Sequence, residues 1–225
     1  MNKEIYVVAG RDDEPYPGFR DRITVIATEI NRAENPLKAW VTLTETPPPK
    51  ISVIPFKRGK IAVFSVIRRE GPTAPVTLLT EMEGFRFAVK ADEATPVAYS
   101  KSWPDGHVTP GVCLLTLFRS RNDISHDTFL HRWHNSHTPL SLRIHPLWHY
   151  SRNVVLETIA GRENGWGGIV EEHVTERSRL LNPFKFFGHP GVVVQNMIEV
   201  YRDTKSFLDY RTIETYLVRE YCIRS

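Results

Sequence analysis

The sequence of 225 residues contains only two cysteines, no long apolar run and no block of basic residues. Cys113 and Cys222 are too few for a disulfide framework, so we interpret both as small buried residues in a protein from a reducing compartment. No apolar stretch is long enough to cross a membrane, and the first residues lack the composition of a signal peptide. These absences predict a cytoplasmic protein that does not insert into a membrane.

The charge pattern also argues against a nucleic-acid partner. The formal net charge is +3 and the pI is about 8.9, which is only mildly basic. No stripe of Lys and Arg is interleaved with aromatic residues, as a nucleic-acid surface would require. Hydrophobic residues make up 41% and charged residues 24% of the chain, which is ordinary for a globular protein of one large or two small domains.

The chain is organised around the stretch 112–155, which holds six of the nine histidines: His126, His131, His134, His137, His145 and His149. Its pattern predicts a strand over 112–118, a helix capped by Ser125, and a second strand over 150–156. Phe129, Trp133, His137 and Leu140 fall on one face of this helix. Pro139 is expected to kink or end it.

This stretch resembles the signature of EthD-domain proteins, which belong to the dimeric α+β barrel superfamily of ferredoxin-like units. The resemblance lies in the segments FLHRWHNSHTPL and HPLWHYSRNVV, and YRDTKSFLDYRTIETYLVREY is similar to the end of that domain. Together the segments cover about the second half of the chain. The matching residues are Phe129, Trp133, His137, Pro139, Leu140, Tyr150 and Asn153. The resemblance implies oxidoreductive or lyase-type degradation of xenobiotic compounds.

The first half repeats the expected order of strands and helices. Its strands are predicted over 4–11, 37–44, 60–68, 85–90 and 96–103, and its helices over 19–32 and 75–83. In the second half, the glycine-rich segment 161–168 is expected to form a mobile hairpin or a lid-like loop. Strands over 169–174 and 212–223 follow. Between them, 177–187 is expected to be helical at first, and 192–201 to be a helix or a strand.

This repetition predicts an α+β protein of two ferredoxin-like βαββαβ units in tandem. The N-terminal half would cover 1–103, a Pro- and Gly-containing linker 104–111, and the EthD-like half 112–225. Because an antiparallel sheet buries one face, each half needs a cover, and two sheets packed face to face as a pseudo-dimeric barrel provide it.

We predict that His137 is the catalytic acid or base, because imidazole exchanges protons near neutral pH. The alternative is a buried histidine that only packs. Tyr150 would donate a hydrogen bond to a carbonyl or phenolate oxygen, unless it is simply a core aromatic. The expected substrate-binding residues are Trp133, Phe129, Leu140, Asn153 and Phe187. Strand alternation places Tyr150 and Asn153 on opposite faces, so we favour Tyr150 in the pocket.

The histidine spacing does not predict a metal site. His131, His134 and His137 are three residues apart, but at ~100° per residue the first and last do not converge. No HExxH motif is present. Haem is an alternative cofactor, since other branches of the superfamily that the chain resembles bind it through a helix histidine.

The favoured interpretation is a cofactor-independent acid/base enzyme, of lyase, isomerase, cyclase or oxidoreductase type. It would act on a small hydrophobic, aromatic or polyketide-like oxo or hydroxy compound. The alternatives are a non-catalytic binding or accessory protein in a degradation pathway, and an assembly protein; a homodimer is also considered. No histidine occurs between residues 1 and 101, so we expect one site per chain, in the C-terminal half.

Overall fold

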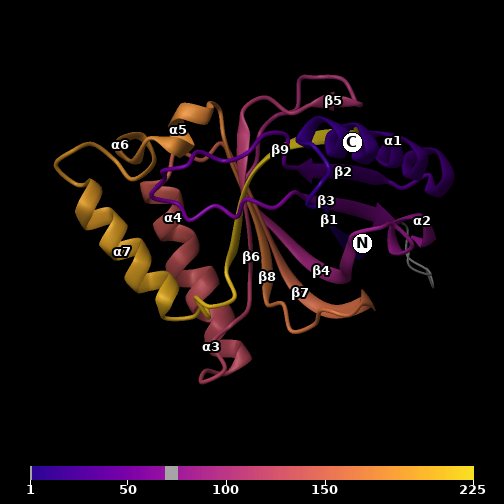
Figure 1. Ribbon diagram of the computed structural model, residues 1–225. Helices are drawn as coiled ribbons and strands as arrows, with labels where there is room; N and C mark the ends of the chain where they lie inside the picture. The colour runs from indigo at the N-terminus through magenta and orange to yellow at the C-terminus, as the bar shows by residue number, and fades with distance from the viewer. Residues whose placement is uncertain (1, 69–75) are drawn as a thin grey trace.

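The computed structural model describes residues 2–68 and 76–225 (Figure 1). The first half contains β1 (Asn2–Ala9), α1 (Tyr16–Glu34), β2 (Lys38–Leu43), β3 (Ile61–Arg68), α2 (Thr77–Thr80) and β4 (Phe85–Val97). The second half contains β5 (His107–Val108), β6 (Val112–Phe118), α3 (His126–His131), η1 (Arg132–His137), α4 (Thr138–Ile144), β7 (His149–Gly161), β8 (Gly168–Val174), α5 (Arg177–Leu181), α6 (Pro183–Phe186), α7 (Val193–Lys205) and β9 (Glu214–Arg224).

The strands form one closed antiparallel barrel with the helices on its outside. The order around the sheet is β2-β3-β1-β4-β7-β8-β6-β9, and a further pairing of β9 with β2 closes it; β5 pairs with the end of β9. The first four strands therefore follow the order β4-β1-β3-β2, and the last four follow the order β9-β6-β8-β7. The pairs β4–β7 and β2–β9 join these two groups edge to edge. Closure leaves few unpaired strand edges.

Residues from both groups of strands fill the barrel interior. Ile5 and Val63 from the first half pack in one cluster with Leu115 and Ile169 from the second. Trp166, from the glycine-rich segment 161–168, lies in the same cluster and stacks on Phe87 with ring centroids 5.4 Å apart. The segment joins the paired strands β7 and β8 as a hairpin, which is one of the two forms expected for it, and the indole anchors it in one end of the barrel.

Helices cover the outer faces of the two strand groups in different ways (Figure 1). In the first half, α1 lays Phe19, Ile23, Ala27 and Ile30 on the sheet, and the short helix α2 adds Leu79 to the same cluster. In the second half, the continuous helical segment α3–η1–α4 and the helix α7 lie side by side on the outer face. Two apolar clusters lie between these helices and the sheet.

Two sequence predictions need correction. The segment 96–103 does not form a separate strand: β4, of which only 85–90 was predicted, continues to Val97 in its pairing with β7. The expected linker, residues 104–111, includes the short strand β5, and its role as a domain boundary stays a prediction. Of the helix predicted over 75–83, only Thr77–Thr80 is helical, and residue 75 lies outside the described residues.

Pro139 does not end its helix, which continues to Ile144. Proline has no N–H and its ring crowds the carbonyl one turn earlier, so an uninterrupted α-helix would be distorted here. A π-helical turn, η1, precedes the proline instead, and the amide of Thr138 reaches back to the carbonyl of Trp133, five residues earlier. The wider turn leaves room for the proline ring without ending the helix. Such π-bulges are frequent at functional sites.

Two further findings bear on the sequence analysis. In the part of the chain that the structure describes, no helix combines the length and apolar character needed to cross a membrane. Cys113 and Cys222 both carry free thiols and are buried, so they pack as core residues.

Candidate functional site

A cavity of about 170 Å³ lies between the outer face of the second-half sheet and its helices. Its walls are mostly apolar and come from β6, β8, β9, η1, α6, α7 and the segment after α7. The lining residues are Ile54, Leu114, Thr116, Phe118, Trp133, His137, His145, Val170, Glu172, Phe186, Phe187, Val200, Thr204, Phe207, Leu208, Tyr210 and Thr215. We call this space the outer cavity.

The first half contributes one residue to the outer cavity. Ile54 lies on the connection between β2 and β3, which crosses to the second half. The amide of Lys57 donates to the carbonyl of Thr215 at 2.8 Å, and the hydroxyl of Thr215 donates to the carbonyl of Pro55 at 2.8 Å. These bonds hold the connection over β9 as part of the cavity wall.

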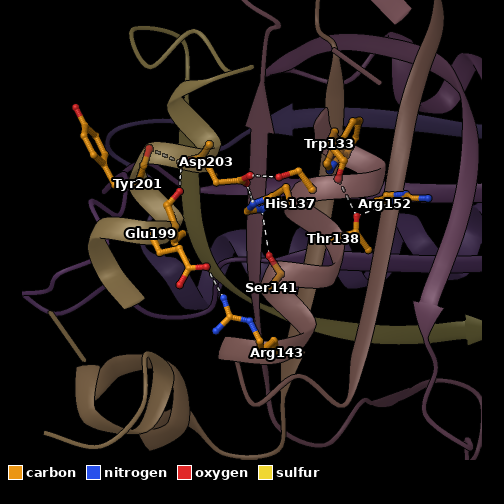
Figure 2. A network of polar contacts seen from close by, with 12 residues as sticks. Trp133, His137, Thr138, Ser141, Arg143, Arg152, Glu199, Tyr201 and Asp203 are labelled. Atoms are coloured by element: carbon orange, nitrogen blue, oxygen red, sulfur yellow. Dashed lines mark hydrogen bonds and ion pairs between the residues drawn. The ribbon is translucent and has the colours of Figure 1, made fainter. Parts of the chain in front are cut away.

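His137 and Asp203 form the central polar pair of the site (Figure 2). Nδ1 of His137 lies 2.8 Å from Oδ2 of Asp203, on the neighbouring helix α7. Because a carboxylate only accepts hydrogen bonds, Nδ1 carries the proton and Nε2 is left as the basic nitrogen. Ser136 donates to the other oxygen of Asp203. The pair therefore fixes both the tautomer and the direction of the ring.

Ser141 extends this pair into a Ser–His–Asp chain, but it is not placed to act as a nucleophile. Its hydroxyl lies 3.1 Å from Nε2 of His137, one helical turn away on α4 (Figure 2). Ser141 is fully buried and does not line the outer cavity. The imidazole, in contrast, lines the cavity, and the His137 side chain is 15% exposed.

The π turn is held by bonds that use the polar atoms around Trp133. The hydroxyl of Thr138 donates to the carbonyl of Trp133 at 3.0 Å, and Arg152 on β7 donates to that hydroxyl at 2.7 Å (Figure 2). Arg143 on α4 also pairs with Glu199 on α7. These contacts fix the two helices that carry His137 and Asp203.

Glu172 is a functional candidate that sequence reasoning missed. It lies on β8, lines the outer cavity and is 8% exposed. Burial raises the pKa of its carboxyl to about 7, with His137 acting in the opposite direction. The alternation of β8 carries a signal, since Glu171 and Glu172 interrupt a buried strand, but the sequence does not show which carboxylate faces the helices.

His145 is a second residue that the sequence did not assign to the site. Its Nδ1–H donates to the carbonyl of Phe186 at 3.1 Å, and its ring stacks on Phe186 at 4.0 Å between centroids. Burial lowers its pKa to about 4, so the ring is neutral at pH 7. The cavity thus presents two imidazoles and one titratable carboxyl group.

The structure separates the residues that the sequence grouped together. Trp133 and Phe187 line the outer cavity with His137. Phe129 packs on Trp133 with ring centroids 5.5 Å apart, and Leu140 is buried in the adjacent apolar cluster; neither lines the cavity. These two side chains support the walls.

Tyr150 and Asn153 face opposite sides of β7, as the alternation predicts. Tyr150 is fully buried on the helix side, behind the cavity, and its hydroxyl has no hydrogen-bond partner among the described residues. Burial raises its pKa. Asn153 points into the barrel and donates to the carbonyl of Ile169 at 3.0 Å. The outer cavity includes neither side chain.

The outer cavity does not fit haem. A space of ~150 Å³ holds one benzene ring, and sites for drug-sized ligands span ~300–1,000 Å³. The outer cavity, at about 170 Å³, suits a compound of one or two rings, or part of a larger one. Both nitrogens of His137 are already engaged in hydrogen bonds. Among the described residues, no group of three or more His, Cys, Asp and Glu side chains is arranged to hold a metal ion.

No protein-family model matches the sequence, and no curated protein matches it. The fold is similar to two solved structures. One is an anthrone oxidase-like protein, 8% identical, with a TM-score of 0.62 over 100% of this chain and 94% of that one. The other is a candidate monooxygenase from Fusobacterium nucleatum subsp. nucleatum, 7% identical, with a TM-score of 0.53 over 99% of this chain and 92% of that one. At these identities the likeness concerns the fold, and the resemblance to EthD-domain proteins stays a prediction.

Proposed function

We propose that the protein is an acid/base enzyme that acts on a small ring-containing oxo or hydroxy compound in the outer cavity, without a bound cofactor. The observation that carries this proposal is the His137–Asp203 pair at 2.8 Å, whose imidazole lines an apolar cavity and whose Nε2 is left as a base. Apolar walls with a few convergent polar groups are typical of small-molecule sites.

The proposed chemistry starts with proton abstraction by Nε2 of His137, once the Ser141 hydroxyl rotates away. The proton comes from a ring hydroxyl or from a carbon activated by a neighbouring carbonyl. Asp203 then stabilises the imidazolium through its bond to Nδ1, as a carboxylate does beside a catalytic histidine. Glu172, with a pKa of about 7, is placed to take or return a second proton. The role of Tyr150 as a hydrogen-bond donor to the substrate oxygen stays a prediction. The Tyr150 hydroxyl would have to move to reach a substrate in the outer cavity.

We further propose an oxidoreductase type of reaction, which the names of the two structural neighbours support. Removal of a carbon-bound proton leaves an electron-rich carbanion, and molecular oxygen is the oxidant. The balanced reaction is R₂CH₂ + O₂ → R₂C=O + H₂O, in which the methylene carbon is oxidised and oxygen is reduced.

The family and organisation are proposals of the same kind. We propose membership of the dimeric α+β barrel superfamily, with two ferredoxin-like units in tandem divided near residues 104–111. The repeated strand order β4-β1-β3-β2 and β9-β6-β8-β7 supports this. A cytoplasmic location and a homodimer remain predictions.

The test uses a panel of one- to three-ring hydroxy and oxo compounds, with anthrone included. Binding is measured by calorimetry, oxygen uptake by electrode and products by mass spectrometry, for the wild type and His137→Asn. We expect turnover of at least one compound, reduced by ~10²-fold or more in His137→Asn with binding retained. Binding without turnover by the wild type would establish a binding protein instead. Equal turnover by the two proteins would remove His137 from the mechanism.

A further inference from the structure

The barrel interior changes character along its axis. On β8 the inward residues run from Ile169 to Glu171 and His173, and on β1 they run from Ile5 to Lys3. The register brings these polar ends together, since Ser151 lies opposite Glu171 across the β7–β8 pair. One end of the barrel is therefore packed with apolar side chains, and the other carries ionisable ones.

A cavity of about 350 Å³ opens at this polar end. We call it the barrel-mouth cavity. Lys3, Ser65, Glu171 and Glu220 line it, and each is at most 6% exposed. Glu93 is more exposed and contributes to its rim. The barrel-mouth cavity is separate from the outer cavity, because neighbouring residues of β8 face opposite sides of the sheet: Glu171 lines one cavity and Glu172 lines the other.

Two buried groups in the barrel-mouth cavity lack the partners that burial normally demands. Ser65 is 3% exposed, and its hydroxyl has no hydrogen-bond partner among the described residues. Glu171 receives one hydrogen bond, from the hydroxyl of Thr42 at 3.2 Å. Burial raises the pKa of Glu171. Buried polar groups are nearly always satisfied, so unsatisfied ones that face a cavity mark a place where a polar ligand or water can bind.

The hydrogen bonds that do form leave acceptors facing the cavity. Lys3 donates to Oε1 of Glu93 at 2.6 Å, and Ser151 donates to the same atom at 2.7 Å. Tyr99 donates to Oε1 of Glu220 at 2.8 Å. Within the described residues, Oε2 of Glu93 and Oε2 of Glu171 accept no hydrogen bond that the structure shows.

Charge favours a cation at the same place. Three carboxyl groups, Glu93, Glu171 and Glu220, face one buried ammonium group, Lys3, while Lys38 lies exposed at the rim. The nearby imidazole of His149 does not offset this excess, because burial lowers its pKa to about 4.

Aromatic side chains complete the walls of the barrel-mouth cavity. Trp40 and Tyr99 line it, and the Tyr99 ring lies 5.0 Å from Trp148 and 4.9 Å from Trp103 between centroids. The faces of such rings attract cations. An organic cation fits this combination better than a metal ion, because the carboxylates do not converge on one point in the part of the chain that is described.

We propose that the barrel-mouth cavity is a second binding site, for a small organic cation with N–H donors such as an aliphatic amine. Glu171 and Glu93 would accept its hydrogen bonds, Ser65 would gain a polar partner, and Trp40 and Tyr99 would cover its carbon chain. The proposal does not rest on the chemistry of the outer cavity.

The test titrates 1,4-diaminobutane into the full-length protein at pH 7.5, with calorimetry and thermal unfolding as readouts. The neutral 1,4-butanediol and the anionic succinate serve as matched probes of similar length. We expect saturable binding of the diamine and a rise in Tm, with neither effect from the other two compounds. In Glu171→Gln we expect at least ~10-fold weaker binding of the diamine, because one carboxylate contact is about that strong.

Two further variants locate the site. Glu172→Gln changes the adjacent residue on the opposite face of β8 and should bind the diamine as the wild type does. Ser65→Ala should fold and bind the diamine more weakly than the wild type does. This variant provides the test if Glu171→Gln does not fold. The proposal is overturned if the diamine does not bind at 10 mM, if succinate binds equally well, or if Glu172→Gln weakens binding as much as the barrel-mouth variants do.

Discussion

The two halves of the chain build the same strand order and cover it differently. In the N-terminal half, α1 is one regular helix of 19 residues whose Phe19, Ile23, Ala27 and Ile30 are all buried against the sheet. In the C-terminal half, a helical segment with a π turn and the separate helix α7 enclose the outer cavity. The same topology thus gives a solid helix–sheet contact on one side and a cavity on the other.

The polar groups differ in the same way. On the outer face of the N-terminal half, the Tyr6 hydroxyl donates to Glu4 and accepts from the amide of Val76 at 3.0 Å. On the C-terminal side, the Tyr150 hydroxyl is buried without such a partner among the described residues, and Glu172 lines the outer cavity. A buried group without a partner reduces stability, and a cavity carboxyl group whose pKa is raised by burial is typical of a functional site. The two halves share the strand order, and the C-terminal half forms a cavity because its helices differ from α1.

The largest expected effects come from truncating one aromatic side chain in each half. Phe19 and Trp133 are both fully buried on helices that face the sheet. We expect each change to Ala to lower the free energy of unfolding by ~3–5 kcal/mol in denaturant titrations. Only Trp133→Ala should also alter which ring compounds bind, since Trp133 lines the outer cavity. An equal change in ligand preference for Phe19→Ala would contradict the division between the halves.

The second prediction concerns the carboxylate partner of His137. Asp203→Asn removes the charge that stabilises the imidazolium, so we expect turnover to fall by ~10²-fold or more and its pH profile to shift. Glu14 provides a matched carboxylate in the N-terminal half, where it accepts two hydrogen bonds from Arg22 at 2.8 Å. Glu14→Gln should lower Tm and leave turnover intact. A purely structural role for Asp203 would lower Tm without moving the pH profile.

The third prediction uses a glycine that the cavity wall requires. A Cβ atom on Gly168 would lie 2.4 Å from Cη2 of Trp133 and 2.6 Å from Cζ of Phe118. We expect Gly168→Ala to lower the free energy of unfolding by ~1–3 kcal/mol, because overpacking forces these rings to move. The control is Gly59→Ala in the N-terminal half, where a Cβ meets nothing within 4 Å. If Gly168→Ala and Gly59→Ala both unfold at the same denaturant concentration as the wild type, Trp133 and Phe118 do not pack tightly against Gly168.

The smallest expected effect is a pH dependence that belongs to the C-terminal half alone. Glu172 has a pKa of about 7 in the folded protein, against 4.5 for an ordinary glutamate. A raised pKa means that the folded state binds the proton more tightly than the unfolded state does. The contribution of this proton to the free energy of unfolding is therefore complete below pH 4.5 and is lost as pH rises through 7.

Glu172→Gln should therefore be no more stable than the wild type near pH 4.5 and become more stable than the wild type above pH 7. We expect a gain on the order of 1–2 kcal/mol at pH 8, less than the full shift implies because a buried amide also needs desolvation. Denaturant titrations of both proteins from pH 5 to 8 measure it. A constant difference across this range would show that Glu172 titrates normally.

Much of this fold was predictable from local patterns. The apolar stripe of α1, the alternation of β2 and the unbroken apolar run of β6 each gave the right element type. Only residues 85–90 of the long strand β4 were predicted as its first part, because the positions near Glu93 are polar and end the apolar pattern. They are polar because they line the barrel-mouth cavity, which no local pattern reveals.

The site was predictable in part for a similar reason. Trp133 and His137 share a helix, so spacing alone brought them together. Asp203 lies 66 residues after His137, and Glu172 lies on a strand whose alternation does not say which face meets the helices. The π turn depends on how Pro139 is accommodated, which requires knowledge of the bond from Thr138 back to Trp133. These features depend on tertiary contacts.

The central claim is that the C-terminal cavity moves a proton through His137. Its most direct test is the exchange of the acidic methylene hydrogens of anthrone with D₂O, followed by mass spectrometry in buffer without oxygen, so that no oxidation intervenes. The account predicts that the wild type accelerates exchange by ~10²-fold or more over His137→Asn, and that His131→Asn, an exposed histidine on the same helical segment, behaves as the wild type does. Equal exchange rates with the wild type and His137→Asn would contradict it.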